Sequence, residues 1–149
     1  MTTSFETGLN RFVRAQDADG DYARAVAEIT AGRKSSHWIW FVFPQVAGLG
    51  RSTLSRIYAI ADLEEARAYV AHSVLGPRLC EITSVALGHG PSSAGDIFGP
   101  DDVKFHSCMT LFALAAPEEA IFRDALSTFF GGELDQGTLA IVHGPASGT

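Results

Sequence analysis

The sequence predicts a mainly α-helical fold: a single-domain array of about seven helices with a buried extended aromatic segment. Apolar residues recur at the i, i+3, i+4 spacing of helices along most of the 149 residues. Capping residues and glycines stand where these stretches begin and end, and the strict alternation typical of strands is almost absent. No repeat or linker divides the chain. We therefore expect one domain over residues 1–149, with its core within 9–142.

Two helices are predicted before residue 32. The first covers about residues 9–16 and is followed by a turn at residues 17–20. The second helix is expected to end at Gly32. Arg33 and Lys34 follow at its C-terminal end, where the negative end of the helix dipole favours basic residues. The second carries one apolar stripe at helical spacing, formed by Tyr22, Ala25, Val26 and Ile29.

Three further helices are predicted in the middle of the chain. Ser52 is a good N-cap for the first, and residues 62–65 form an Asp variant of the capping box that opens the second. The third covers residues 75–86, where Pro77 is tolerated only in the first turn. The first helix bears Leu54, Ile57, Tyr58 and Ile60, the second is expected to turn Leu63, Ala66, Tyr69 and Val70 inward, and in the third helical spacing is kept by Leu75, Leu79, Ile82, Val85 and Ala86.

Two more helices are predicted after a turn-rich stretch at residues 88–95. Asp101 or Asp102 caps the first, which extends to about residue 115. The second runs from about Pro117 to Phe129 and ends at the two glycines that follow. After it we expect a last short turn at residues 139–142 and a frayed tail at 144–149.

The aromatic block at residues 38–43 is the exception to the helical pattern, because it has strong β propensity. A lone strand needs a partner for its backbone, and the only candidate is the stretch 139–142. We therefore expect a buried extended or single-turn segment inside the helical array. Pro44 favours extended geometry at Phe43 in either case.

Composition excludes several classes of function. The formal net charge of −6 disfavours a nucleic-acid or anionic-membrane surface, so neither partner is expected. The chain starts without a secretory signal, and no window approaches the roughly 18 apolar residues of a membrane span. Cys80 and Cys108 lie in apolar helical patterns and are expected to be reduced, buried thiols. A cytoplasmic location follows as the default.

Basic and hydroxyl residues run directly into the aromatic block at residues 33–45. Two tryptophans two positions apart cannot face the same side of a helix, and each indole N–H needs an acceptor when it is buried. One interpretation is that the block is only the hydrophobic centre of the fold. The flanking polar residues instead favour a ligand site, with His37 as the catalytic candidate. The candidate ligand-binding residues of this motif are Lys34, Ser36, Trp38, Trp40 and Gln45.

The stretch Ala47–Thr53 follows at once and ends at a predicted helix start. Gly48 and Gly50 allow the backbone to approach a ligand closely, and free N–H groups near Ser52 favour an anion. The guanidinium group of Arg51 can donate two parallel hydrogen bonds to a phosphate or a carboxylate. The stretch is not a Walker loop, because it lacks the glycine spacing and the Gly-Lys-Ser/Thr ending.

A third candidate is the predicted helix at residues 102–112, which is apolar nearly all round and is therefore expected to be buried on most sides. Its polar residues Lys104, Ser107 and Thr110 would then face an internal cavity or a neighbouring loop. The alternative is an ordinary amphipathic helix whose Lys104 extends to solvent. The first interpretation makes the site two converging segments, 33–53 and 102–112.

Several established templates are missing from the sequence. No two histidines stand at i, i+3 or i+4, and neither cysteine has a CxxC partner, so no metal site is predicted. There is no nucleophile elbow and no dinucleotide-binding glycine motif, and no cofactor is predicted. The acidic pair Asp101-Asp102 is more typical of a helix cap than of a catalytic dyad.

The motif SHWxWFxFPQxAGLG at residues 36–50, preceded by Arg33-Lys34, resembles a widespread bacterial domain-of-unknown-function family. Some of its members are labelled calpastatin, although inhibitors of that kind are disordered and proline-rich, unlike this chain. Cys108 stands where the family usually has a small hydroxyl residue. The likeness covers about residues 9–142 and implies a single-domain helical fold without an assigned activity. Further matching stretches are 11–13 with 15–17, 58–60, 74–79, 97–99, Asp102 with Lys104, and 109–112.

A looser likeness, in architecture and in the Lys104-Phe105 helix, is to the helical NADAR-type domains that act on ADP-ribose-related groups. The leading hypothesis is therefore a small-molecule site for a phosphorylated or nucleotide-like ligand, with N-glycosidic hydrolysis as its reaction. His37 would be the acid–base group. Trp38 and Trp40 would enclose the ligand, and Lys34, Arg51 and Lys104 would hold its anionic part.

The rival hypothesis is a non-catalytic protein-interaction domain whose aromatic motif is structural core. It predicts that Lys34, His37 and Lys104 lie far apart and face solvent. It also predicts a sizeable exposed apolar patch elsewhere.

Overall fold

The computed structural model describes residues 4–143, and over that range it is helical without a strand. The mainly α-helical, single-domain prediction is confirmed. The seven expected helices are present, joined by three short ones, and the expected frayed tail at 144–149 lies outside the described residues. The helices are α1 (Ser4–Asp17), α2 (Asp21–Thr30), α3 (Ile39–Val42), α4 (Thr53–Ile57), α5 (Leu63–Ala71), α6 (Leu75–Leu87), α7 (Ala94–Phe98), α8 (Asp102–Ala115), α9 (Ala120–Phe130) and α10 (Gln136–Val142), with 3-10 turns η1 (Ala18–Gly20) and η2 (Gly99–Asp101).

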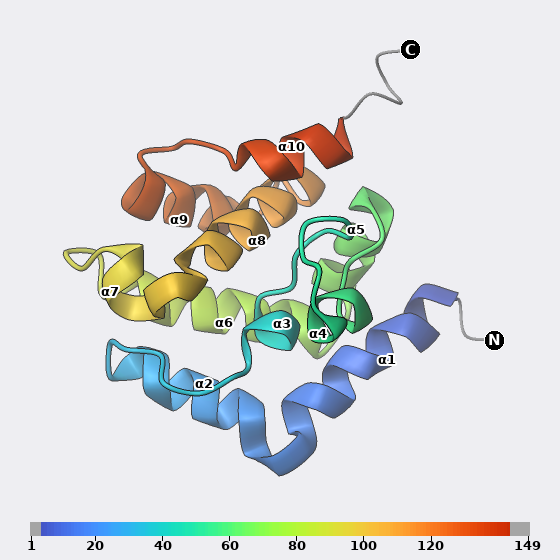
Figure 1. Cartoon of the computed structure of the whole chain (residues 1–149), viewed down its shortest axis with the longest axis horizontal. Coiled ribbons are helices and arrows are strands. Elements are labelled where there is room, and N and C mark those ends of the chain that lie inside the picture. The colour runs from blue at the N-terminus through green and yellow to red at the C-terminus, as the bar shows by residue number, and fades with distance from the viewer. Residues whose placement is uncertain (1–3, 144–149) are drawn as a thin grey trace.

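Helix α8 lies at the centre of the array and packs against α5, α7, α9 and α10 (Figure 1). Helix α6 lies behind it, in contact with α2, α5 and α9. Helices α1 and α2 meet at η1 and diverge from it as the two arms of a V along one edge of the array (Figure 1). The short helices α3 and α4 lie on the front face of the array in Figure 1, between α1 and α8. None of the helices within residues 4–143 is long and apolar enough to cross a membrane.

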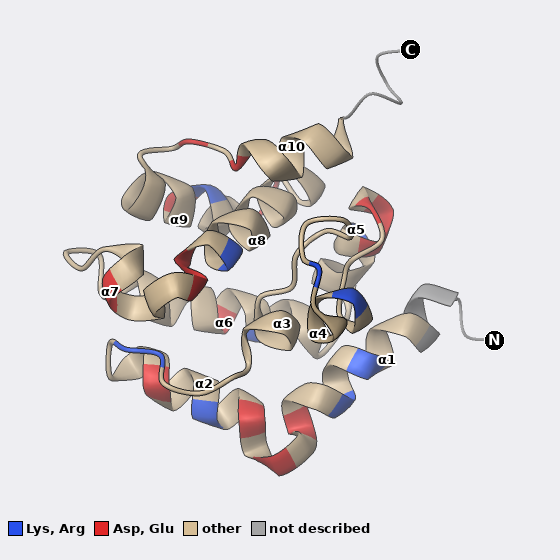
Figure 2. Ribbon diagram, in the orientation of Figure 1, with Lys and Arg blue, Asp and Glu red and all other residues tan. Residues whose placement is uncertain are grey.

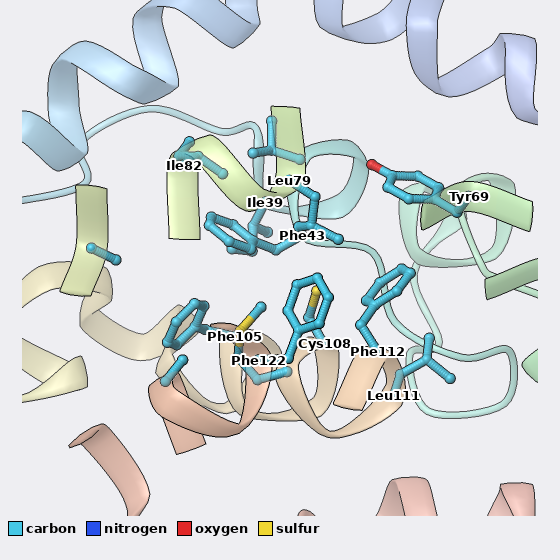
Figure 3. Packing of buried hydrophobic residues seen from close by; sticks show 14 of the residues in the cluster. Ile39, Phe43, Tyr69, Leu79, Ile82, Phe105, Cys108, Leu111, Phe112 and Phe122 are labelled. Atoms are coloured by element: carbon cyan, nitrogen blue, oxygen red, sulfur yellow. The ribbon is translucent and has the colours of Figure 1, made fainter. Parts of the chain in front are cut away.

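The core is rich in aromatic side chains that come from α3, α5, α7, α8 and α9. Phe105 of α8 is fully buried and stacks on Phe98, with ring centroids 4.2 Å apart. Phe43 meets Phe105 edge to face at 5.1 Å, an arrangement that the ring quadrupoles favour. Figure 3 shows Phe43, Ile39 and the α6 side chains on one side of this core and Phe105 and Phe112 on the other. Cys108 is buried as expected, whereas Cys80 is only half-buried, and both are free thiols.

The aromatic block at residues 38–43 forms one helical turn, which was the second of the two expected geometries. Its backbone needs no strand partner, because Val42 N–H donates to Trp38 O at 3.2 Å and Phe43 N–H to Ile39 O at 3.0 Å. Residues 139–142, the only candidate for a partner strand and the site of the expected last turn, are part of α10. The carbonyl oxygen of Phe41 accepts a hydrogen bond from the buried side-chain amide of Gln16, on α1, at 2.7 Å.

Gln16 is itself held by a buried polar network between α1, α5 and α6. Its amide nitrogen also lies 3.2 Å from the Tyr69 hydroxyl, and Arg78 donates to its amide oxygen at 3.2 Å. Arg78 in turn pairs with Asp17 at 2.8 Å. Burial raises the pKa of Tyr69 well above its ordinary value. Because Gln16 also binds the Phe41 carbonyl, this network holds α3 in place against α1.

The segment after α3 differs from the prediction. Ser52 caps α4 as expected, accepting from Ser55 N–H at 3.1 Å, but the helix ends at Ile57. Its apolar residues Leu54 and Ile57 are 40% and 48% exposed, and Ile60, expected on the same helix, lies beyond its end. The reason is that the chain must turn back at once: Ile60 forms an isolated parallel bridge with Val46.

Other helix ends agree with the local signals. Asp62 caps α5, and α9 ends at Gly131 in the left-handed conformation, with Gly132 N–H donating back to Leu126 O at 2.9 Å. Helix α9 starts at Ala120, three residues later than Pro117. Asp101 occupies the N-cap position of α8 but makes no side-chain cap bond, because its carboxylate is used elsewhere.

Candidate functional site

A groove of about 640 Å³ lies between the loop after α2 and the segment where α7 leads into α8. One wall consists of residues 33–37 and the other of residues 95–101, and Trp40 of α3 closes one side. Figure 2 shows basic residues in the loop after α2 and acidic residues where α7 leads into α8. The volume lies within the range of small-molecule sites. The groove brings together four of the predicted site residues: Lys34, Ser36, His37 and Trp40.

The loop at residues 35–38 is organised by one carboxylate, that of Glu28 in the last turns of α2. Its Oε1 accepts from the backbone N–H of Ser35 at 2.8 Å and of Ser36 at 2.9 Å, and from the indole N–H of Trp38 at 2.9 Å. Its Oε2 accepts from the Ser36 hydroxyl. Burial alone raises the pKa of Glu28, but these four hydrogen bonds outweigh it and lower the pKa to about 2.

We expect the protein to lose stability as the pH falls from about 4.5, the ordinary pKa of Glu28, towards about 2. A carboxyl group whose folded-state pKa is depressed stabilises the fold fully above the unfolded-state pKa, and the contribution vanishes as the group is protonated in the folded state. Urea unfolding of the wild type and of Glu28→Gln between pH 7 and pH 2.5 measures the contribution of Glu28 to the free energy of unfolding. The variant should be less stable at pH 7 and should show a flatter decline below pH 4.5; parallel curves for the two proteins would contradict the assignment.

Lys34 and Lys104 share a single counter-ion, Asp101. Lys34 Nζ lies 2.8 Å from Asp101 Oδ2 and Lys104 Nζ lies 3.2 Å from Asp101 Oδ1. The Lys34 side chain is only 7% exposed and lies 5.0 Å from the centre of the Trp38 ring, whereas Lys104 is 30% exposed. Burial raises the pKa of Asp101, but the two ammonium groups lower it further, so the net shift is downward. Lys34 is thus committed to the fold, and Lys104 retains capacity for a ligand.

The two tryptophans have separate roles. Trp38 is 1% exposed and is held by Glu28, so it is part of the core and makes no wall of the groove. Trp40 is half-buried and lines both the groove and a second, small hollow. That hollow also contains Gln45, Gly50 and Lys104, three further predicted residues.

His37 and Arg33 are two polar side chains of the groove that the fold does not use. Both are exposed, and within residues 4–143 neither side chain makes a hydrogen bond or an ion pair with the protein. Asp96, on the opposite wall, accepts from the N–H of Ser93 in a capping box. The groove therefore presents an uncommitted guanidinium and an imidazole beside an aromatic ring.

The predicted anion loop is not part of the groove. Gly48 faces Ile141 of α10, and Arg51 and Ser52 are exposed and line neither hollow. A Cβ at Gly50 would lie 2.3 Å from Cβ of Ser55, so this glycine permits the close approach of α4 and also lines the small hollow.

Ser107 and Thr110 of α8 also have a structural use. The Ser107 hydroxyl lies 3.1 Å from Asp135 Oδ2, and the Thr110 hydroxyl accepts from Asp135 N–H at 2.9 Å. Asp135 then caps α10 through the N–H of Thr138 at 3.0 Å. The polar face of α8 thus faces a neighbouring loop, one of the two expected settings, and only Lys104 reaches the site.

Two residues that shape the groove were not predicted: Glu28, which holds residues 35–38, and Asp101, which was expected only as a helix cap and pairs with Lys34 and Lys104. Glu28 stands on a polar helix face with nothing local to distinguish it from other exposed glutamates. The proximity of Asp101 to Lys34-Ser35-Ser36 in space is a property of the fold. No group of three potential metal ligands occurs among residues 4–143.

The fold and the groove define a small all-helical protein with one open polar-aromatic site. The chain belongs to the family described as "Protein of unknown function (DUF1810)", whose model matches residues 6–142. This confirms the resemblance to a domain-of-unknown-function family. The crystal structure of the conserved hypothetical protein Rv1873 from Mycobacterium tuberculosis is similar, with a TM-score of 0.86 and 47% identity over 90% of this chain and 95% of that one. None of the curated proteins matches the chain significantly.

Proposed function

We propose that the groove between residues 33–37 and 95–101 binds a small phosphorylated or nucleotide-like ligand of the ADP-ribose type. The observation that carries the proposal is the placement of Arg33 and His37 beside the ring of Trp40 in a groove of about 640 Å³, with neither side chain bonded to any of residues 4–143. A guanidinium holds a phosphate through two parallel hydrogen bonds, and an indole stacks on a base. Lys104 adds a further cation at the edge of the site.

The convergence of the cationic side chains supports a pocket over the rival interaction domain. Lys34 and His37 line the same groove, and Lys104 is joined to Lys34 through Asp101. The rival hypothesis requires these three residues to lie far apart. The exposed apolar residues Leu54 and Ile57 of α4 are the observation that favours a protein partner, and they lie outside the groove.

Thermal-shift and fluorescence titrations with ADP-ribose, NAD, AMP and ADP test the proposal. We expect binding to raise the melting temperature and to change the emission of Trp40, with no emission change in Trp40→Phe. Arg33→Ala should weaken binding by roughly ten- to a hundredfold, the effect of losing a charge-assisted hydrogen bond. Arg14→Ala, an exposed arginine on α1, is the matched control. An unchanged melting temperature and emission across the panel would refute the proposal.

For catalysis we propose N-glycosidic hydrolysis with His37 as the acid–base group. Water adds to the anomeric carbon and gives up a proton, which the imidazole of His37 accepts as general base, while the carbon–nitrogen bond breaks and its electron pair stays on the leaving nitrogen. With NAD as substrate the products are nicotinamide and ADP-ribose, which chromatography separates. His37→Ala should abolish turnover with little change in the affinity for ADP-ribose. Equal turnover in this variant would assign the chemistry to another group.

We also propose a cellular location and a range of partners for this function. We place the protein in the cytoplasm, where nucleotide-like ligands are abundant, and we expect no nucleic-acid or membrane partner in view of the net charge of −6.

A further inference from the structure

A small hollow shares Trp40 with the groove, and we call it the hollow behind Trp40. It is lined by residues of four separate segments: Trp40 of α3, Gln45 of the following loop, Tyr58 at the end of α4, and Lys104 of α8. Its volume is about 10 Å³, which is close to the minimum that holds a single water-sized group. Phosphate, with five heavy atoms, does not fit there.

Three polar side chains around this hollow are not used by the fold, whereas a fourth, Ser55, accepts a hydrogen bond from the Ser52 hydroxyl at 2.9 Å. Within residues 4–143 the indole N–H of Trp40, the amide of Gln45 and the hydroxyl of Tyr58 make no hydrogen bond with the protein. The ammonium group of Lys104 has one partner, Asp101, and is 30% exposed. Trp40 and Lys104 only donate hydrogen bonds, while Gln45 and Tyr58 both donate and accept. Such a set matches one oxygen atom that accepts strongly and also carries a proton, which is a hydroxyl group.

The hollow adjoins the groove at two places. Trp40 is a wall of both, and Lys104 in the hollow lies 3.2 Å from Asp101 in the groove. The two spaces therefore adjoin, so that a ligand in the groove can place one atom in the hollow. No carboxylate or imidazole lines the hollow, so it holds an oxygen without a base to activate it.

We infer that the hollow behind Trp40 is a specificity subsite for one sugar hydroxyl of the ligand, and that the groove selects ribose phosphates over deoxyribose phosphates and over inorganic phosphate or diphosphate. The inference rests on the proposed function of the groove. A site that hydrogen-bonds a hydroxyl rejects the analogue that lacks it, because the polar groups of the site are left unpaired.

Calorimetric titration of the full chain with AMP, 2′-deoxy-AMP, 3′-deoxy-AMP and diphosphate tests the inference. The wild type should bind AMP about tenfold more tightly than one of the two deoxy analogues, and diphosphate more weakly than AMP. Gln45→Leu and Tyr58→Phe should each reduce this ratio and leave the affinity for the weaker analogue unchanged. Arg33→Ala is the matched control in the groove: it should weaken all nucleotides alike and preserve the ratio.

The two proposals fail in different ways. If no nucleotide binds the wild type, the proposed function of the groove is refuted, and this inference with it. If AMP and both deoxy analogues bind the wild type equally, the subsite is refuted while the groove stands, and the wild-type ratio decides this without any variant. A ratio that persists in both Gln45→Leu and Tyr58→Phe assigns the selection to other residues and also overturns the inference.

Discussion

Replacing Phe105 with alanine is expected to lower the free energy of unfolding by about 3–5 kcal/mol, the range for a buried phenylalanine. The side chain is fully buried, and its ring meets four others: Phe98 at 4.2 Å, Phe43 at 5.1 Å, and Phe129 and Phe130 at 5.8 and 6.0 Å. These rings come from α7, the loop after α3, and α9, so the cavity would lie where three parts of the array meet. Part of the loss reflects the removal of this apolar surface, and the rest reflects the void.

Urea unfolding followed by circular dichroism measures the effect. Val103→Ala is the matched control on the same helix, because Val103 is 63% exposed and its truncation should change stability by less than about 0.5 kcal/mol. A loss below about 1 kcal/mol for Phe105→Ala would show that the aromatic cluster does not hold the array together.

Replacing Gly76 with alanine should also destabilise the fold strongly, although alanine is the better helix former. Gly76 is buried in the first turn of α6, and a Cβ there would lie 2.0 Å from the carbonyl oxygen of Val70 and 2.9 Å from its carbonyl carbon. Both atoms belong to the backbone of α5, so no side chain can move aside, and the two helices must separate. We expect a net loss of about 2–3 kcal/mol, after the gain of about 1 kcal/mol in helix propensity.

Gly95→Ala provides the comparison within α7. A Cβ at Gly95 would meet its nearest neighbours, Asp102 Oδ2 and Ser93 Oγ, only at 3.7 Å, which is ordinary contact. This variant should be neutral or slightly stabilising, because only the propensity changes. Similar melting temperatures for the two variants would contradict the close approach of α5 and α6.

Helix boundaries were predictable wherever the deciding interactions are local. The cap at Ser52 depends on an N–H three residues away, as does that at Asp62, and the stop at Gly131 depends on one left-handed residue. The extent of α4 was not predictable in this way. Its apolar residues follow helical spacing, but the bridge of Ile60 to Val46 ends the helix early and leaves Leu54 exposed.

The candidate site was only half predictable for the same reason. The motif at residues 33–45 does lie at the groove, because its charged and aromatic residues are adjacent in sequence. Which of them face the ligand depends on partners elsewhere: Glu28 draws Trp38 into the core, and Asp101 takes Lys34. Ser107 is likewise bound to Asp135, 28 residues later in the chain. Such pairings follow from tertiary packing and leave no local sequence signal.

Lys34 joins the two walls of the groove at two points, since its N–H donates to Ile97 O at 2.7 Å and its ammonium pairs with Asp101 at 2.8 Å. Glu28 fixes the rest of the first wall to α2. The width of the groove is therefore set before any ligand arrives, and little conformational entropy is lost on binding. Association should then be a single step whose observed rate rises linearly with ligand concentration, without the plateau of a slow closure. A rigid groove of this kind discriminates between ligands by their fit and adapts poorly to bulkier ones.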